Sequence, residues 1–94
     1  MRSPSTLLRI RPSDLAWRAV GDSIVILDLR TSSYLSISGS GTIIWAALKD
    51  EATQIELVEA VLQQYEVDAN TAARDVEEFL NKLDAKGLVE YRSA

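Results

Sequence analysis

The 94-residue chain contains no cysteine and no histidine. The first absence excludes disulfides and thiolate nucleophiles, and the two together exclude every ordinary zinc or haem site. Without histidine the chain also lacks the commonest general base near neutral pH. One small domain of this length offers little cleft for a site made of carboxylates alone. We therefore expect no metal, no cofactor and no catalytic residue, and a protein that is not an enzyme.

Long hydrophobic runs are also missing. The N-terminal segment has three arginines within its first eleven residues, but its longest apolar run is Leu7-Leu8. It therefore does not resemble a signal peptide, and no segment is long enough to span a membrane. Apolar residues form 47% of the chain and charged residues 26%, which is the balance of a folded soluble domain. These features predict a cytoplasmic protein that does not contact a membrane.

Charge is divided unevenly along the chain. Residues 1–36 hold five arginines against three acidic residues, whereas residues 37–94 hold five basic residues against eleven acidic ones. The acidic part would repel phosphate backbones, since nucleic-acid affinity depends on cations that meet phosphates. The composition therefore favours a neutral or cationic partner over a nucleic acid.

The first half of the chain has the pattern of β-strands. Residues 1–14, with Pro4 and Pro12, are expected to form a flexible N-terminal arm, from which Leu7, Leu8 and Ile10 could still dock on the domain. Strands are predicted over 17–20, 23–29 and 34–38, joined by short turns at Gly21-Asp22 and at 31–33. Three consecutive strands with short turns give an antiparallel meander, in which the third strand is an edge.

The second half has the pattern of helices. Helices are predicted over 42–49, from a capping box at Thr53 to about Tyr65, and from Asp68 or Asn70 to a left-handed cap at Gly87. The serines of the Ser38–Gly41 link are expected to cap the first helix, and 88–91 to add a short final strand. The predicted fold is α+β, with a three-stranded antiparallel sheet followed by a three-helix winged-helix-like bundle.

The third strand is the most informative segment. Tyr34, Ser36 and Ser38 alternate with Leu35 and Ile37, and the strand has neither the lysine nor the proline that protects an edge from pairing. A terminal segment, a second copy of the chain or a peptide partner could each cover this edge. The residues alone leave these alternatives open.

The third helix carries a wide apolar stripe. Part of the stripe could line a groove against the third strand, and the alternative is a simple three-helix core. The stripe consists of Val76, Phe79, Leu80 and Leu83.

The order of these residues resembles the PqqD-like family, the RiPP recognition elements that bind leader segments of ribosomally made precursor peptides. The resemblance covers residues 15–91, and Ser38 stands where the family often has asparagine. It is carried by three phrases: Asp28-Leu29-x-Thr31-x-x-Tyr34-x-x-Ile37-Ser38-x-x-Gly41-x-x-Ile44-Trp45-x-x-Leu48, then Ile55-x-x-Val58-x-x-Val61-x-x-x-Tyr65, and finally Asp75-Val76-x-x-Phe79-Leu80-x-x-Leu83-x-x-x-Gly87-Leu88-Val89.

The resemblance implies a non-catalytic adaptor whose leader peptide extends the sheet in the cleft between the third strand and the third helix. The pairing strand would be Tyr34, Leu35, Ser36 and Ile37. The opposite wall would be Val76, Phe79, Leu80 and Leu83, with Asp75 and Lys82 as charges at its rim.

The partners that the resemblance implies belong to two pathways. In a lasso-peptide pathway the adaptor, a monomer when free, hands its precursor to a leader peptidase and a cyclase. In the pyrroloquinoline quinone pathway it presents the precursor to a radical SAM enzyme. The chain as a whole resembles the lasso-peptide branch slightly more, although no single motif distinguishes the two. A winged-helix regulator that binds DNA and a module that self-associates through the same edge are the alternatives from other classes.

Overall fold

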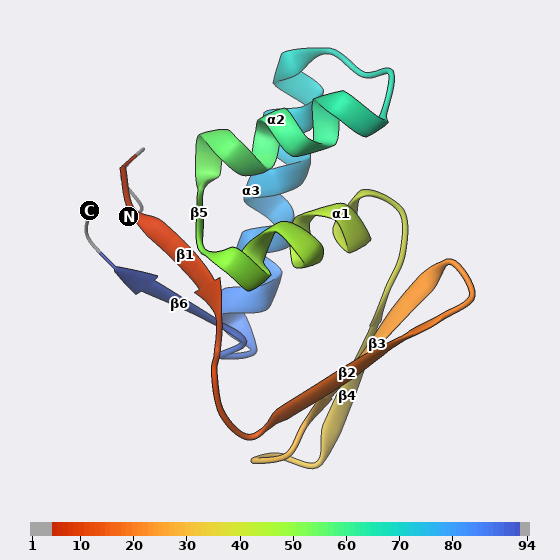
Figure 1. Cartoon of the computed structure of the whole chain (residues 1–94), viewed down its shortest axis with the longest axis vertical. Coiled ribbons are helices and arrows are strands. Elements are labelled where there is room, and N and C mark those ends of the chain that lie inside the picture. The colour runs from red at the N-terminus through yellow and green to blue at the C-terminus, as the bar shows by residue number, and fades with distance from the viewer. Residues whose placement is uncertain (1–4, 93–94) are drawn as a thin grey trace.

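The computed structural model describes residues 5–92 of the chain, which form two small sheets and three helices (Figure 1). The three-stranded sheet and the three helices confirm the α+β fold class. In chain order the elements are β1 (Leu7–Ile10), β2 (Leu15–Val20), β3 (Ser23–Asp28), β4 (Ser33–Ile37), α1 (Ser40–Ala47), a 3₁₀ turn (Leu48–Asp50), β5 (Ala52–Thr53), α2 (Gln54–Gln64), α3 (Ala69–Ala85) and β6 (Val89–Arg92).

The predicted meander is present as the antiparallel sheet β2-β3-β4, with β3 in the middle. The turn between β2 and β3 is Gly21-Asp22, in which Gly21 takes a φ of 61°. A positive φ at the first of two turn residues is the geometry of a tight hairpin turn that glycine adopts without strain. The sheet projects away from the helices in Figure 1, and β4 forms one of its two edges.

The second sheet was not predicted. In it β1 pairs with β5 on one side and with β6 on the other, both antiparallel. The side chains of Leu8 and Ile10 are buried in the core. The prediction of a flexible arm over residues 1–14 is therefore wrong for residues 7–10, because burial and strand pairing on both sides fix them. Residues 1–4 of that predicted arm lie outside the described residues.

The beginning of α1 also differs from the prediction. Gly39, with a φ of 61°, is the N-cap residue, and no side chain caps the helix. The hydroxyl of Thr42 instead donates to the carbonyl of Gly39 at 2.8 Å. The expected serine cap is wrong, because the left-handed backbone at Gly39 turns the chain from β4 into α1 and leaves neither neighbouring serine hydroxyl in the capping position.

The other helix ends follow the prediction. Thr53 and Glu56 form the capping box of α2, and Asp68 caps α3 by accepting from the backbone N–H of Thr71. At the end of α3, Gly87 takes a φ of 68° and the N–H of Leu88 donates to the carbonyl of Leu83 at 3.0 Å. This is the left-handed termination in which the residue after the glycine packs back on the helix. It turns the chain directly into β6.

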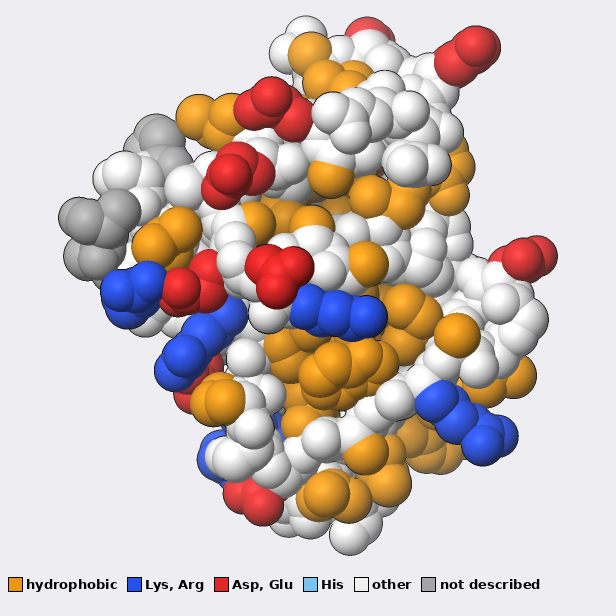
Figure 2. Space-filling model, viewed as in Figure 1, with side chains coloured by type: hydrophobic (Ala, Val, Ile, Leu, Met, Phe, Trp, Pro, Cys, Tyr) orange, Lys and Arg blue, Asp and Glu red, His pale blue; other side chains and the backbone are white. Residues whose placement is uncertain are grey.

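One core joins the helices to both sheets. Trp45 on α1 is fully buried, as predicted, and its ring meets that of Trp17 on β2 edge to face, with ring centroids 5.3 Å apart. On the face seen in Figure 2, hydrophobic side chains gather between the helices and the projecting sheet. The sheet is thus held against the helices by apolar contacts at its inner face. Within residues 5–92, no helix has the length and apolar character needed to cross a membrane.

Candidate functional site

An open groove of about 440 Å³ separates the end of β4 from α3, and the start of α1 closes one end of it. A smaller hollow of about 20 Å³ continues along β4 toward the C-terminal end of α3. The groove is lined by Ser36, Ile37, Ser38, Ser40, Gly41, Asp75, Glu78, Phe79 and Lys82. The hollow is lined by Ile26, Asp28, Ser33, Tyr34, Leu35, Lys86 and Leu88.

The register of the sheet shows which backbone groups of β4 are free to pair. Val20 and Ser23 flank the two-residue turn, and such a pair exchanges both hydrogen bonds. Odd-numbered residues of β3 therefore bond to β2, which agrees with the N–H of Leu29 donating to the carbonyl of Asp14 at 2.9 Å. Even-numbered residues of β3 bond to β4, where their partners are Ser33, Leu35 and Ile37.

The remaining two residues of β4, Tyr34 and Ser36, consequently direct their backbone N–H and C=O groups to the open edge. Their side chains lie on the outer face of the sheet, and that of Tyr34 is 76% exposed. Ile37 has the opposite orientation, with its side chain only 4% exposed and its backbone bonded toward β3. The edge is thus open for a further strand at Tyr34 and Ser36.

Phe79 forms the apolar part of the α3 wall. Its ring is half-buried and packs against the hydrophobic core. Gly41 lies beneath the ring, since a Cβ at this position would stand 3.0 Å from Phe79 Cε1. The missing side chain at Gly41 therefore allows α1 and α3 to approach closely and keeps the ring at the bottom of the groove.

Three other residues that were predicted for this wall do not line it. Val76, Leu80 and Leu83 are 0% exposed and belong to the hydrophobic core. The prediction therefore does not match the groove lining at these three positions, which belong to the core. The wide stripe of α3 arises because the helix packs against α1, α2 and β6, which leaves Phe79 as its one apolar residue in the groove lining.

Charged residues flank Phe79 along α3. Asp75, half-buried, and Glu78 lie toward the N-terminal half of the helix, and Lys82 follows one turn after Phe79. Asp75 and Lys82 were predicted as rim charges, and both line the groove. Within residues 5–92, no three acidic side chains gather closely enough to hold a metal ion.

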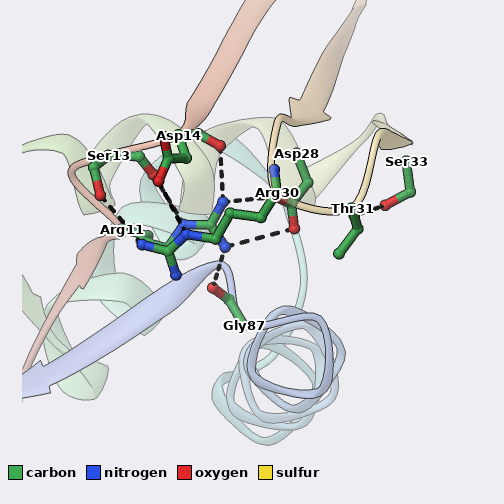
Figure 3. A network of polar contacts seen from close by, with 8 residues as sticks. All are labelled: Arg11, Ser13, Asp14, Asp28, Arg30, Thr31, Ser33 and Gly87. Carbon is green, nitrogen blue, oxygen red and sulfur yellow. Dashed lines mark hydrogen bonds and ion pairs between the residues drawn. The ribbon is translucent and has the colours of Figure 1, made fainter.

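A buried arginine fixes the sheet against the end of α3 (Figure 3). The guanidinium of Arg11 donates to Asp28 through two nitrogens, at 2.7 and 3.5 Å, and to the carbonyl of Gly87 at 3.0 Å. Further bonds run to the carbonyls of Ser13 and Asp14. Arg11 thereby joins the link between β1 and β2, the end of β3 and the turn after α3, and it sets how the sheet stands relative to that helix.

The contact between Arg11 and Asp28 also changes the pKa of the Asp28 carboxyl. The hydrogen bonds from Arg11 lower the pKa of Asp28 below its ordinary value, against the opposing effect of desolvation, and the backbone N–H of Arg30 adds to the shift. Asp28 therefore stays ionised and paired well below neutral pH.

Several residues of the groove were missed from the sequence. They are Ser38, Ser40, Gly41 and Glu78 in the groove itself, and Lys86 in the smaller hollow. Glu78 lies three residues after Asp75, and Lys86 lies four residues after Lys82. This helical spacing from the two predicted rim charges was the signal that could have identified both as groove residues. Nothing in the sequence pattern indicates that Arg11 pairs with Asp28, because the pairing depends on β1 being part of the domain.

The fold and the groove define a small α+β domain in which a sheet edge and a helix face leave room for an extended segment between them. The chain belongs to the PqqD family, described as coenzyme PQQ synthesis protein D, whose model matches residues 23–89. No curated protein sequence matches the chain significantly.

Two solved structures are similar to the chain over most of its length. The first, TbiB1 in complex with the TbiA(beta) leader peptide, is 32% identical, with a TM-score of 0.79 over 87% of this chain and 94% of that one. The second, lasso peptide synthetase B1 complexed with the leader peptide, is 23% identical, with a TM-score of 0.77 over 88% of this chain and 96% of that one.

Proposed function

We propose that this protein binds the leader peptide of a ribosomally synthesised precursor as an added strand on β4, in the groove between β4 and α3. The observation that carries the proposal is an open strand edge beside a groove, in a chain 32% identical to a protein solved with a leader peptide. The backbone groups of Tyr34 and Ser36 supply the hydrogen bonds, and Phe79 and Leu35 supply apolar contacts.

The protein itself catalyses no reaction in this proposal. It presents the precursor to a leader peptidase and a cyclase of a lasso-peptide pathway. The likeness to lasso peptide synthetase B1 supports this branch. The second candidate is presentation to a radical SAM enzyme in pyrroloquinoline quinone synthesis, which the description of the family model supports.

DNA binding by the winged-helix-like part is disfavoured by charge. The exposed surface of α3 has three basic residues, Arg74, Lys82 and Lys86, against four acidic ones. A helix that meets phosphates needs the opposite balance. The acidic residues are Asp75, Glu77, Glu78 and Asp84.

The test is a titration of the isotope-labelled protein with the synthetic TbiA(beta) leader peptide, followed through backbone amide resonances. The proposal expects the largest shifts at Tyr34 and Ser36 on β4 and around Phe79 on α3. Shifts confined to β2, the other edge of the same sheet, would contradict the assignment of the groove. An absence of shifts at millimolar peptide would contradict the proposal as a whole.

A further inference from the structure

We propose that the groove selects leader peptides by the order of charged residues along the bound strand. At the Ile37 end the strand carries a basic side chain, and at the Tyr34 end it carries an acidic one. The two are four residues apart, with an apolar side chain midway between them. This inference rests on the proposed function, because it concerns the peptide that occupies the groove.

The charges that carry the inference lie on one face of α3. Asp75, Glu78 and Lys82 on the helix and Lys86, its C-cap residue, follow one another at intervals of three or four residues, which places them in a single row. All four line the groove or the smaller hollow that continues it. The row is acidic in its first half and basic in its second.

The strand β4 runs along this row in the opposite direction. Its last residues, Ser36 and Ile37, share the groove with two acidic residues, Asp75 and Glu78, and with one basic residue, Lys82. Its first residues, Ser33 and Tyr34, share the smaller hollow with Lys86. A strand added to β4 therefore meets negative charge at one end and positive charge at the other.

These four residues have no partner in the part of the chain that the structure describes. Among residues 5–92, none of them takes part in an ion pair or a side-chain hydrogen bond. Four arginines elsewhere do pair with carboxylates: Arg9 with Glu90, Arg11 with Asp28, Arg30 with Asp14 and Arg92 with Glu51. The charges of the groove are thus available to a ligand, and three of the four, Glu78, Lys82 and Lys86, are exposed to solvent.

The lengths of the two elements fix the spacing in the peptide. The middle of the acidic pair and the middle of the basic pair are separated by about 11 Å along the helix, at roughly 1.5 Å per residue. Four residues of an extended strand cover about 13 Å, and residues four apart point to the same side. Phe79 lies between the two charged groups, so the side chain two residues from each charge meets an aromatic ring.

The test is selection from an mRNA-displayed library of random twelve-residue peptides on the immobilised protein. A charge-reversed variant, Asp75→Lys, Glu78→Lys, Lys82→Glu and Lys86→Glu, is selected in parallel and keeps the net charge of the chain. The exposed pair Arg74→Glu and Asp84→Lys, on α3 outside the groove lining, is the matched control. Ser36→Pro, which removes a donor at the open edge, gives the background of peptides that bind elsewhere.

Among peptides enriched on the unaltered protein and on the control, we expect those with one charge order to be about fivefold more frequent than those with the reverse order. This ratio is the size expected for solvent-accessible ion pairs. The charge-reversed variant should enrich the opposite order. Peptides that depend on Ser36 but show no charge order, or the same order on both proteins, would overturn this inference and leave the proposed function standing. No enrichment above the Ser36→Pro background would overturn both.

Discussion

Gly41 lies so close to Phe79 that a β-carbon at position 41 would stand 3.0 Å from the ring carbon Cε1. This contact connects the start of α1 to the groove wall on α3. It makes the position of the ring depend on a residue that touches the groove only through its backbone.

Gly41→Ala should therefore weaken leader binding with little effect on stability. The added methyl group displaces the ring of Phe79 by a few tenths of an ångström. The crowding costs about 1 kcal/mol, and the better helix propensity of alanine offsets about the same amount. Calorimetric titration with a leader peptide and thermal unfolding measure the two effects. Ser40→Ala, one residue earlier, is the control, and equal affinities for the two variants would contradict the role of Gly41.

Phe79→Ala should mainly lower the affinity for the leader peptide, whereas Leu80→Ala should mainly lower the stability of the fold. Leu80 is 0% exposed, so its truncation leaves a cavity and lowers the free energy of unfolding by about 2–5 kcal/mol, while the folded fraction keeps its affinity. Phe79 is half-buried beside the groove, so its truncation should lower affinity by about tenfold with a smaller loss of stability. Urea unfolding and anisotropy of a fluorescent leader peptide separate the two. A loss of affinity in folded Leu80→Ala would show that the peptide reaches the helix interior.

The contact between Arg11 and Asp28 should make stability depend on acid pH. Its hydrogen bonds lower the pKa of Asp28 in the folded state, so the stabilisation is fully present above the ordinary pKa of aspartate. It is lost as the pH falls through the lowered folded-state pKa, because the carboxyl is then protonated in both states. Asp28→Asn removes this contribution. The difference in unfolding midpoint between the two proteins should be constant near neutral pH and shrink below about pH 4. A difference that does not change over that range would contradict the assignment.

Strand and helix patterns in the sequence were sufficient to predict the three-stranded meander and the three helices. The alternation of Tyr34 and Ser36 with Leu35 and Ile37 identified β4, and the capping box at Thr53 placed the start of α2. For α3 the sequence offered Asp68 or Asn70, and the structure has Asp68 as the cap. These are local signals, in which neighbouring residues satisfy one another. The edge position of β4 followed from three consecutive strands joined by two short turns, and the sheet order confirms it.

Features that depend on distant segments were missed. The strand β1 lies in a segment with arginines and prolines, and it is held by core burial and by pairing with β5 and with β6, which comes from the other end of the chain. The burial of Leu80 and Leu83 and the exposure of part of Phe79 depend on how α3 packs against α1, α2 and β6. Hydrophobic periodicity shows which residues share the apolar face of a helix. It does not show which other element of the fold each of these side chains contacts.

The free protein should be a monomer, since the proposed ligand for the edge of β4 is a leader peptide. Sedimentation equilibrium at tens of micromolar protein is expected to give the mass of one chain. A tight dimer that dissociates when Ser36 is replaced by proline would indicate that two copies pair through this edge. Such a result would favour a self-associating module over an adaptor.

The central claim is that a leader peptide completes the sheet through the backbone of β4. Ser36 is exposed and its N–H points to the open edge, so Ser36→Pro removes one donor without breaking a bond to β3. Ile37→Pro is unsuitable for this test, because Ile37 is bonded toward β3 and buried in the core. Circular dichroism and thermal unfolding establish that the Ser36→Pro variant is folded, and Ser36→Ala controls for the hydroxyl.

The decisive measurement is the affinity of these two variants for one leader peptide, determined by isothermal titration calorimetry. We expect folded Ser36→Pro to bind at least about tenfold more weakly than Ser36→Ala, since a bound backbone carbonyl loses its donor. Ser36→Ala should bind as the unaltered protein does. Equal affinity of folded Ser36→Pro and Ser36→Ala would contradict strand addition at β4.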